Sequence, residues 1–153
     1  MFLKLKPAIQ AREIIEVIHD NDKVAQGKVL FKLKDTMQDT WFAEEFIENN
    51  GIAILSSFIN RSKGNLQAYC LAGLRAALVY VSAMNVISDS PRIVDEIYNL
   101  TDTSQEYGLT IYKNALELIL VFVSYLENGL TLVKKAAKDA TLKQKTKEPY
   151  RNF

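Results

Sequence analysis

The chain has 153 residues, 48% of them hydrophobic and 24% charged, with only six glycines and three prolines. This composition is typical of one compact folded domain and excludes a disordered chain. Seven Lys/Arg against two acidic residues give residues 134–151 a charge of +5, which leaves twelve against sixteen, or −4, in residues 1–133. A mildly acidic body offers no broad positive field for a phosphate backbone, so we expect no nucleic-acid binding. No segment reaches the ~18 uncharged apolar residues of a membrane span, so we expect no stable membrane insertion.

The one cysteine, Cys70, cannot form an internal disulfide. It lies in the apolar run Tyr69–Ala72, where a free cysteine usually behaves as a small core residue. The N-terminus also lacks the apolar stretch of a signal peptide. Together these features predict a cytoplasmic protein.

Helical spacing of apolar residues predicts three helices in the first third of the chain. They span about residues 7–19, 24–37 and 41–47. Asn21 or Asp22 can cap the second of them.

A turn at residues 49–51 ends the third helix, because Gly and Asn commonly occupy helix C-termini. A short helix over residues 52–59 follows, and the polar segment 62–65 breaks it. A long helix then runs from Leu66 to about Met84. It is apolar on three sides, so neighbouring helices must cover most of its circumference.

The pair Ser90-Pro91, a cap followed by a first-turn proline, opens the next helix, which ends at Leu100. After a polar turn, a second long helix ends near Glu127. A strand is the alternative for its apolar segment 116–123. Apolar residues fill both faces for about twenty positions without a turn signal, which favours a buried helix.

Residues 128–129, Asn-Gly, end this helix, and residues 130–140 form the last one. The segment 141–153 is a lysine-rich tail. Clustered lysines can attract anionic lipid headgroups, but a solvated helix end, favoured by the helix dipole, is the simpler interpretation.

An internal repeat decides the fold prediction. A shift of 42 residues superposes two units, each a short helix, a polar turn and a long buried helix. The superposed pairs are Ile52 with Val94, Leu55 with Ile97, Phe58 with Leu100, Leu74 with Leu116, Ala77 with Ile119, Leu78 with Leu120 and Val81 with Val123. A shift of 41 weakly adds a third unit, with the pairs Leu30 and Leu71, Leu33 and Leu74, and Met37 and Leu78. We therefore expect a continuous core at Leu74, Leu78, Val81, Leu116, Leu120 and Val123.

Helical units of about 40–47 residues are typical of armadillo and HEAT arrays. The predicted fold class is all-α: an armadillo-like right-handed helical solenoid, with two clear repeats of about 42 residues and a weak N-terminal one. Residues 1–153 would form a single domain, and residues 141–153 would begin an incomplete next repeat. Because about three units are needed for stability, we expect a longer array. A four-helix bundle is the alternative.

Residues suited to catalysis are scarce. His19 is the only histidine, which excludes a two-histidine metal site, and a solvated or capping role explains its position. The pairs Glu13/Glu16 and Glu44/Glu45 are explained as helix-surface charges, since acid–base catalysis needs a pocket that separates the two pKa values. No glycine-rich phosphate loop is present. The sequence therefore predicts no enzyme and no cofactor.

Function must then lie in a surface. Trp41 could anchor a partner, but a core position in its helix is the preferred interpretation. In a right-handed array of three-helix units the last helices line the concave wall, so polar positions on the two long helices are candidate protein-binding residues. Ordinary solvent exposure explains them equally well. They are Gln67, Arg75, Ser82 and Asn85 on the first helix, and Asn114, Glu117, Ser124 and Glu127 on the second.

Several strings resemble a known family in order and spacing, over roughly residues 24–153. They read YVSAMNVI at residues 80–87, IYNL at 97–100, KNALELILVFVSY at 113–125 and PYRN at 149–152. In these strings the chain resembles the formin homology 3 region, the armadillo-repeat inhibitory domain of formins, and is most similar to the FHOD-like branch.

The resemblance implies regulation of actin assembly. In that family the concave surface holds an amphipathic C-terminal autoregulatory helix of the same polypeptide, which keeps the actin-nucleating domain off. A Rho-family GTPase bound near the N-terminal side releases it. The chain departs from the family by lacking a full GTPase-binding module before residue 24, so the resemblance supports helix binding more directly than GTPase binding. It also implies a cytoplasmic, cytoskeleton-associated protein.

Two alternatives remain open. The armadillo scaffold of ELMO-type adaptors, which serve Rac activation, is the nearer one. A small enzyme or ligand-binding helical bundle is the other, and it would require an apolar pocket with convergent polar groups between the long helices.

Overall fold

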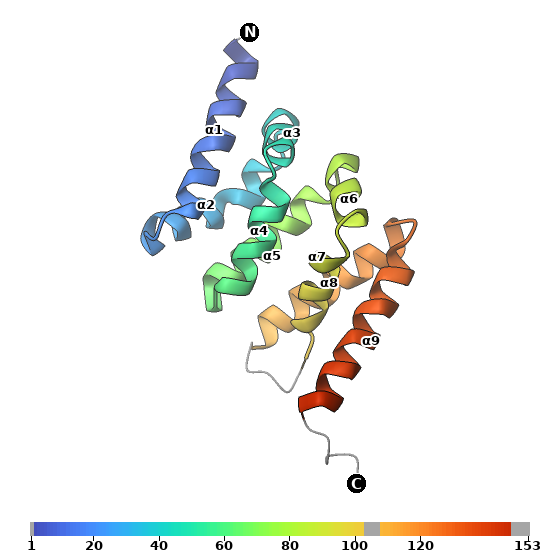
Figure 1. The fold of residues 1–153 in the computed structure, drawn as a ribbon. Helices are drawn as coiled ribbons and strands as arrows, with labels where there is room; N and C mark the ends of the chain where they lie inside the picture. Colours follow the sequence, from blue (N-terminus) through green and yellow to red (C-terminus); the bar gives the residue numbers. More distant parts are fainter. Residues whose placement is uncertain (1, 103–107, 148–153) are drawn as a thin grey trace.

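The computed structural model describes residues 2–102 and 108–147. Within these two ranges the chain is all-helical, with nine α-helices and no strand (Figure 1). The helices are α1 (Phe2–His19), α2 (Lys23–Thr36), α3 (Thr40–Glu48), α4 (Gly51–Arg61), α5 (Gly64–Ala77), α6 (Val81–Ser88), α7 (Pro91–Asn99), α8 (Leu109–Tyr125) and α9 (Gly129–Lys147).

The helices stack one after another, with α1 and α9 at opposite ends of the stack (Figure 1). Helix α5 contacts both α2 and α8, and α4 and α7 pack against α5 and α8 respectively. Helix α1 covers α3, and α9 covers α7 and α8. This arrangement is consistent with a helical solenoid and differs from a four-helix bundle, in which four long helices surround one core.

Local signals position most helix ends where the sequence predicts them. Asp22 caps α2: its carboxylate accepts hydrogen bonds from two N–H groups of the first turn, at 3.0 and 3.2 Å. Asp39 caps α3 in the same way. Asn50 adopts the left-handed conformation (φ 65°) between α3 and α4, which confirms the predicted stop there. Pro91 is the first residue of α7, where its missing N–H has no helical acceptor.

Two boundaries differ from the prediction. Helix α1 begins at Phe2, so Pro7 lies inside it; its buried ring contributes to packing, and its missing N–H costs one hydrogen bond near the helix start. Helix α9 continues past Ala140 to Lys147, because no Gly or Pro interrupts residues 130–147. Residues 148–153 of the predicted tail lie outside the described residues.

The predicted long helix over residues 66–84 is wrong. Helix α5 ends at Ala77, α6 begins at Val81, and the two helices bend by 113° at the break. Tyr80 is extended (φ −98°, ψ 134°), and its hydroxyl donates a 2.7 Å hydrogen bond to the backbone carbonyl of Met37. The residues at the break are Leu, Val and Tyr, so neither glycine nor proline signals the bend in the sequence. The segment 116–123, in contrast, is helical as predicted.

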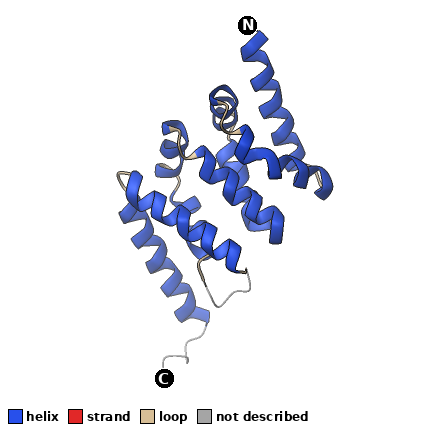
Figure 2. Cartoon of the chain, turned by 180° about the vertical axis from the view of Figure 1, so that it is seen from behind, coloured by secondary structure: helices blue, strands red, loops and turns tan. Residues whose placement is uncertain are grey.

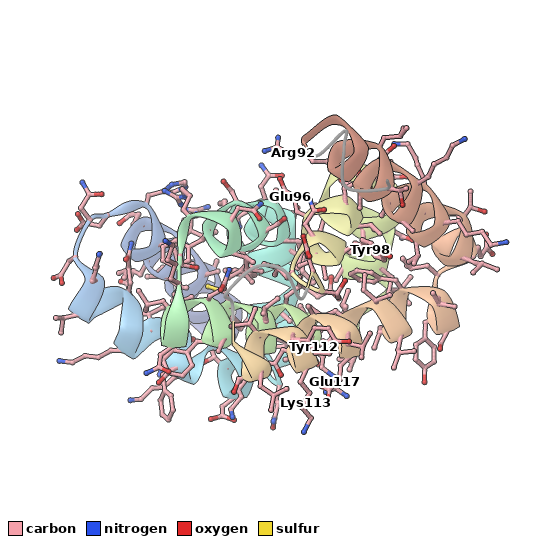
Figure 3. All side chains as sticks on the ribbon, turned by 90° about the horizontal axis from the view of Figure 1, so that it is seen from below. Arg92, Glu96, Tyr98, Tyr112, Lys113 and Glu117 are labelled. Atoms are coloured by element: carbon pink, nitrogen blue, oxygen red, sulfur yellow. The ribbon has the colours of Figure 1, made fainter. Side chains whose placement is uncertain are left out.

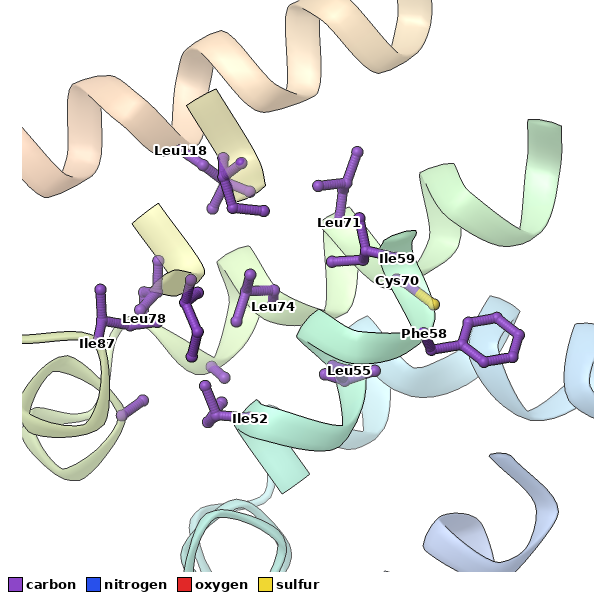
Figure 4. Packing of buried hydrophobic residues seen from close by; sticks show 14 of the residues in the cluster. Ile52, Leu55, Phe58, Ile59, Cys70, Leu71, Leu74, Leu78, Ile87 and Leu118 are labelled. Atoms are coloured by element: carbon purple, nitrogen blue, oxygen red, sulfur yellow. The ribbon is translucent and has the colours of Figure 1, made fainter. Parts of the chain in front are cut away.

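Buried side chains form one core that runs through the stack, and Figure 4 shows its centre, where α4, α5, α6 and α8 meet. Leu74 and Leu78 are buried there as predicted. The other four predicted positions are wrong, since Val81, Leu116, Leu120 and Val123 are 74%, 40%, 59% and 37% exposed. The buried residues of α8 are Ile111, Ala115, Leu118, Ile119 and Phe122.

The length of one connection explains this error. The 42-residue shift holds for the short helices, whose paired residues Ile52, Leu55, Phe58, Val94, Ile97 and Leu100 are all buried. The 41-residue shift holds for α2 and α5, where both members of each pair are buried. On α8, however, the buried counterparts of Leu71, Leu74 and Leu78 lie 44 residues later, at Ala115, Leu118 and Phe122. The connection from α7 to α8 is thus two residues longer than the shift assumes, which turns the wrong face of α8 toward the core.

A buried glutamine marks the same position on α2 and on α5. Gln26 is 5% exposed, and its Nε2 donates a 3.0 Å hydrogen bond to the backbone carbonyl of Ile18. Gln67 is 3% exposed, and its Nε2 donates to the carbonyl of Ile59 at the same distance. Each amide joins the first turn of an inner helix to the last turn of an earlier helix and satisfies a helix-end carbonyl.

Candidate protein-binding face

Helices α2, α5 and α8 lie side by side and present one side of the molecule to solvent, which we call the three-helix face (Figure 2). Lys28, Tyr69 and Lys113 occupy equivalent places on it, each two residues before a buried position of its helix. In Figure 3 the side chains of Lys113 and Glu117 point away from the rest of the molecule on this side. The outward positions are Val24, Lys28 and Phe31 on α2, Asn65 and Tyr69 on α5, and Leu109, Lys113, Leu116, Leu120 and Val123 on α8.

Four apolar side chains form a continuous line along α8, which we call the α8 stripe. They are Leu109, Leu116, Leu120 and Val123, and they are 81%, 40%, 59% and 37% exposed. Their spacing of seven, four and three residues keeps them on one face of the helix. This face is turned away from the buried residues of α8, and its side chains remain 37–81% exposed. Exposed apolar side chains gathered on one helix face are typical of a protein-binding site.

An ion pair connects α5 to α8 beside the stripe. The guanidinium of Arg75 donates to the carboxylate of Glu117, and the two side chains are 54% and 33% exposed. Both residues are candidate binding residues, and the structure shows that they contact each other. A partner would therefore meet a pre-formed pair rather than two separate charges.

The other candidate residues fall into three settings. Gln67 is buried in the core, so it is not part of any exposed surface. Ser82 and Asn85 lie on α6 rather than on a long helix, and the Ser82 hydroxyl bonds a Glu44 carboxylate oxygen of α3 at 3.2 Å. The remaining three are Asn114, half-buried on α8, Ser124, exposed on α8, and Glu127, exposed just after α8.

Trp41 is 45% exposed, which contradicts the predicted core position. Its neighbour Phe42 is completely buried and stacks on Phe46 at 5.7 Å between ring centroids. Both aromatic residues could not face the core, because adjacent residues differ by about 100° around a helix. The sequence alone does not show which of the two is inside.

Sequence reasoning missed the α8 stripe, because the 42-residue shift assigned three of its members to the core. A signal was present. The positions buried on α2 and α5 repeat as 26, 30, 33, 37 and 67, 71, 74, 78. The same spacing fits positions 111, 115, 118 and 122 on α8 if the connection between α7 and α8 is longer than the shift assumes. With this register the residues of the α8 stripe are not in the core.

The groups considered for catalysis are not assembled into a site. Cys70 is fully buried, as predicted, and this burial raises the pKa of its thiol to about 12, while nearby Arg61 lowers it slightly. His19 is exposed at the end of α1. Among the described residues, no group of three His, Cys, Asp or Glu side chains could hold a metal ion.

In the two described ranges, no single helix is long and apolar enough to cross a bilayer. Helices α5 and α6 reach that length and apolarity only together, and the two are bent by 113° relative to each other.

Comparison with known proteins identifies the family. A family model described as the FHOD1/3 FH3 domain matches residues 64–153, more than half of the chain. The chain belongs to this formin FH3 family. It is 35% identical over 153 residues to Formin-G of Dictyostelium discoideum, covering 99% of this chain and 14% of Formin-G. It is 27% identical over 154 residues to FH1/FH2 domain-containing protein 3 of Mus musculus, covering 100% of this chain and 10% of that protein.

A more distant relative represents the ELMO alternative. ELMO domain-containing protein A of Dictyostelium discoideum is 23% identical over 109 residues, or 70% of this chain and 11% of that protein. The formin resemblance is confirmed, and the shorter, weaker similarity does not displace it. The chain spans about a tenth to a seventh of the length of these relatives. As an FH3 domain it is a regulatory rather than a catalytic part of a formin.

Proposed function

We propose that this domain mediates autoinhibition of a formin, with the three-helix face as the concave wall of an armadillo-like right-handed solenoid. The occupant is an amphipathic autoregulatory helix of the same polypeptide, which keeps actin nucleation off while it is bound. Membership of the FH3 family supports this proposal. The order of short helices and inner helices supports the solenoid, since α5 and α8 each follow a shorter helix, α4 and α7, against which they pack.

The α8 stripe is the observation that carries the proposal. Its four apolar side chains stand on one helix face and are exposed, which suits the apolar face of an amphipathic helix laid along α8. The Arg75–Glu117 pair and Lys113 lie beside it and would set the orientation of the occupant. Asn85, Asn114, Ser124 and Glu127 remain proposed contacts at the edges of this surface.

Release by a Rho-family GTPase completes the proposal. A GTPase that binds the open state more tightly than the closed state shifts the population toward the open one. We place its contact near the N-terminal side of the chain, away from α8. The whole protein would then act in the cytoplasm at the actin cytoskeleton, in keeping with its formin relatives.

Titration of the formin's C-terminal autoregulatory peptide against this domain tests the proposal. Leu120→Glu places a charge in the middle of the α8 stripe, at a side chain that is 59% exposed, so the fold should persist. We expect the affinity to fall about tenfold or more, because the new carboxylate loses its hydration under the bound helix. Ile9→Glu on α1, at a 47% exposed side chain, is the matched control and should bind like the wild type.

Circular dichroism and thermal unfolding of each variant establish that it is folded. A folded wild-type domain that does not bind the peptide would contradict the proposal. So would a peptide that tolerates Leu120→Glu and cross-links to the opposite side of the molecule, where α1 and α9 lie.

A further inference from the structure

A separate groove lies between the first turns of α2 and α5, at the other end of the three-helix face from the α8 stripe. Its volume is about 420 Å3. The apolar part of its lining is formed chiefly by Phe31, Leu66 and Tyr69. Lys23 and Lys28 supply the charged part. The groove is shallow and open to solvent, and it combines an apolar floor with two ammonium groups.

The interior of the groove is pre-formed by an aromatic pair and a glycine. The rings of Phe31 and Tyr69 meet edge to face, with centroids 5.3 Å apart and an interplanar angle of 73°. Phe31 is nevertheless 55% exposed. Gly27 also lines the groove, and a Cβ there would lie 3.7 Å from Leu66 Cδ2. The missing side chain leaves room for an apolar group from another molecule.

Both lysines that line the groove are available to pair with an anion. Within the part of the chain that the structure describes, no carboxylate pairs with Lys23 or Lys28. Helix α5 begins at the groove, and its N-cap residue Lys63 makes no side-chain capping bond. The N–H groups of its first turn therefore add the partial positive charge of a helix N-terminus to this end of the groove. Asp22, next to Lys23, keeps its negative charge while its carboxylate caps α2. Both charged residues of the lining itself, Lys23 and Lys28, are positive.

We propose that this groove docks an acidic peptide segment that carries one aromatic or leucine side chain. The apolar side chain packs onto the surface formed by Phe31, Leu66 and Tyr69, and carboxylates on either side of it pair with Lys23 and Lys28. Charge complementarity selects this occupant, because a basic segment would bring like charges onto both lysines. The site goes beyond the proposed function, since it requires neither the α8 stripe nor an autoregulatory helix.

Two short synthetic peptides test this site by NMR titration of the 15N-labelled chain. One has the sequence Asp-Glu-Phe-Asp-Glu with blocked ends, and the other replaces all four acids by lysine. At millimolar concentration we expect the acidic peptide to shift the amide signals of Gly27, Asn65 and Leu66. The lysine peptide should leave these signals unchanged.

Variants of the groove separate its steric and charged parts. Gly27→Leu fills the groove, while Gly27→Ala makes only an ordinary contact and favours the helix, so it is the matched control. Lys23→Glu combined with Lys28→Glu reverses two exposed charges and should leave the fold intact. We expect about tenfold weaker binding of the acidic peptide by Gly27→Leu and by the double reversal, and unchanged binding by Gly27→Ala.

Three results would overturn the proposal: shifts that map elsewhere, equal shifts with the lysine peptide, or a double reversal that binds the acidic peptide like the wild type. The double reversal decides the question even if Gly27→Leu does not fold. Because the α8 stripe is untouched in these variants, their outcome is independent of the titration with the autoregulatory peptide.

Discussion

Leu116 and Leu118 stand two positions apart on α8, and two residues turn a helix by about 200°. Leu118 is completely buried and Leu116 is 40% exposed. We therefore expect Leu118→Ala to lower the free energy of unfolding by about 2–5 kcal/mol, through lost burial and a residual cavity. Leu116→Ala should lower it by about 1 kcal/mol or less, because that side chain is already in contact with water. Chemical denaturation of both variants, monitored by circular dichroism, measures the difference.

The same pair of variants tests the register of α8. If Leu116→Ala lowers the free energy of unfolding as much as Leu118→Ala does, the 42-residue shift describes the core of α8 correctly and Leu116 is a core residue. The expected order instead places the side chain of Leu116 on the binding surface, where its removal should affect peptide affinity more than stability.

The burial of Cys70 can be tested through the pH dependence of the free energy of unfolding. The folded state raises the pKa of its thiol from 9.0 to about 12, so folding favours the neutral thiol. Its contribution to stability is therefore complete below pH 9 and is lost as the pH rises from 9 toward 12, by about 1.4 kcal/mol per unit. Cys70→Ala removes this dependence and no other titration. The difference in unfolding free energy between wild type and Cys70→Ala should thus shrink between pH 8.5 and 10.5, by about 1.4 kcal/mol for each pH unit above 9.

Thiol labelling gives an independent measurement on Cys70. At pH 8 the buried thiol should react with a soluble reagent only through opening of the chain. Rapid labelling of the folded protein, or a pH-independent difference from Cys70→Ala, would contradict the burial of this residue.

At the scale of helices, the buried glutamines form the most regular feature of the stack. Gln67→Met keeps the length of the side chain but removes its amide, so the backbone carbonyl of Ile59 keeps only the 3.3 Å hydrogen bond from the Ser62 hydroxyl. We expect a loss of about 0.5–1.5 kcal/mol in the free energy of unfolding, the usual net worth of one intramolecular hydrogen bond. Gln10→Met at an exposed position on α1 is the control and should change stability by less than about 0.5 kcal/mol. A loss for Gln67→Met no larger than for the control would show that this amide does not hold α5 against α4.

The helices themselves could be predicted from local chemistry. Asp22, the turn at Asn50 and Pro91 mark three boundaries through local chemistry, although the Ser90 side chain makes no capping hydrogen bond. The bend between α5 and α6 could not be predicted, because it depends on a hydrogen bond from Tyr80 to Met37, 43 residues away. Helical periodicity carries no information about such a contact.

The candidate site was predicted only in part, for a related reason. Arg75 and Glu117 were found because they are polar residues in apolar helices, and the structure brings them together. The α8 stripe was missed because its residues are apolar and were placed in the core. Whether a leucine faces a neighbour or solvent depends on the register of its helix, and register depends on the length of the connection before α8.

At the scale of the whole molecule, the three-helix face changes in character along the stack. At the α2 end an apolar groove is combined with two lysines, and at the α8 end the exposed side chains include the four apolar ones of the α8 stripe together with Lys113 and Ser124. A long partner could contact both ends at once, and if one chain reached both proposed sites it would bind more tightly than it would to either site alone. Helix α5 and its ion pair to α8 lie between them and fix their separation.

The Arg75–Glu117 pair can be tested for its part in both stability and binding. Because the two side chains are 54% and 33% exposed, the pair should contribute only about 0–1 kcal/mol to stability. Arg75→Glu and Glu117→Arg, each alone, place like charges side by side and should cost a similar small amount. The double exchange restores opposite charges and should recover the stability of the wild type, as a double-mutant cycle by chemical denaturation will show.

Peptide binding should respond differently to the same exchange. If the pair orients the autoregulatory helix, the partner's charges match one order of Arg75 and Glu117 and not the reverse. Each single reversal should then weaken the affinity, by a few kcal/mol at most if the contact is desolvated and by less if it is screened. The double exchange should stay weaker than the wild type although its stability has recovered. An affinity that recovers together with stability would show that the pair only holds α5 against α8, and that recognition depends on the α8 stripe alone.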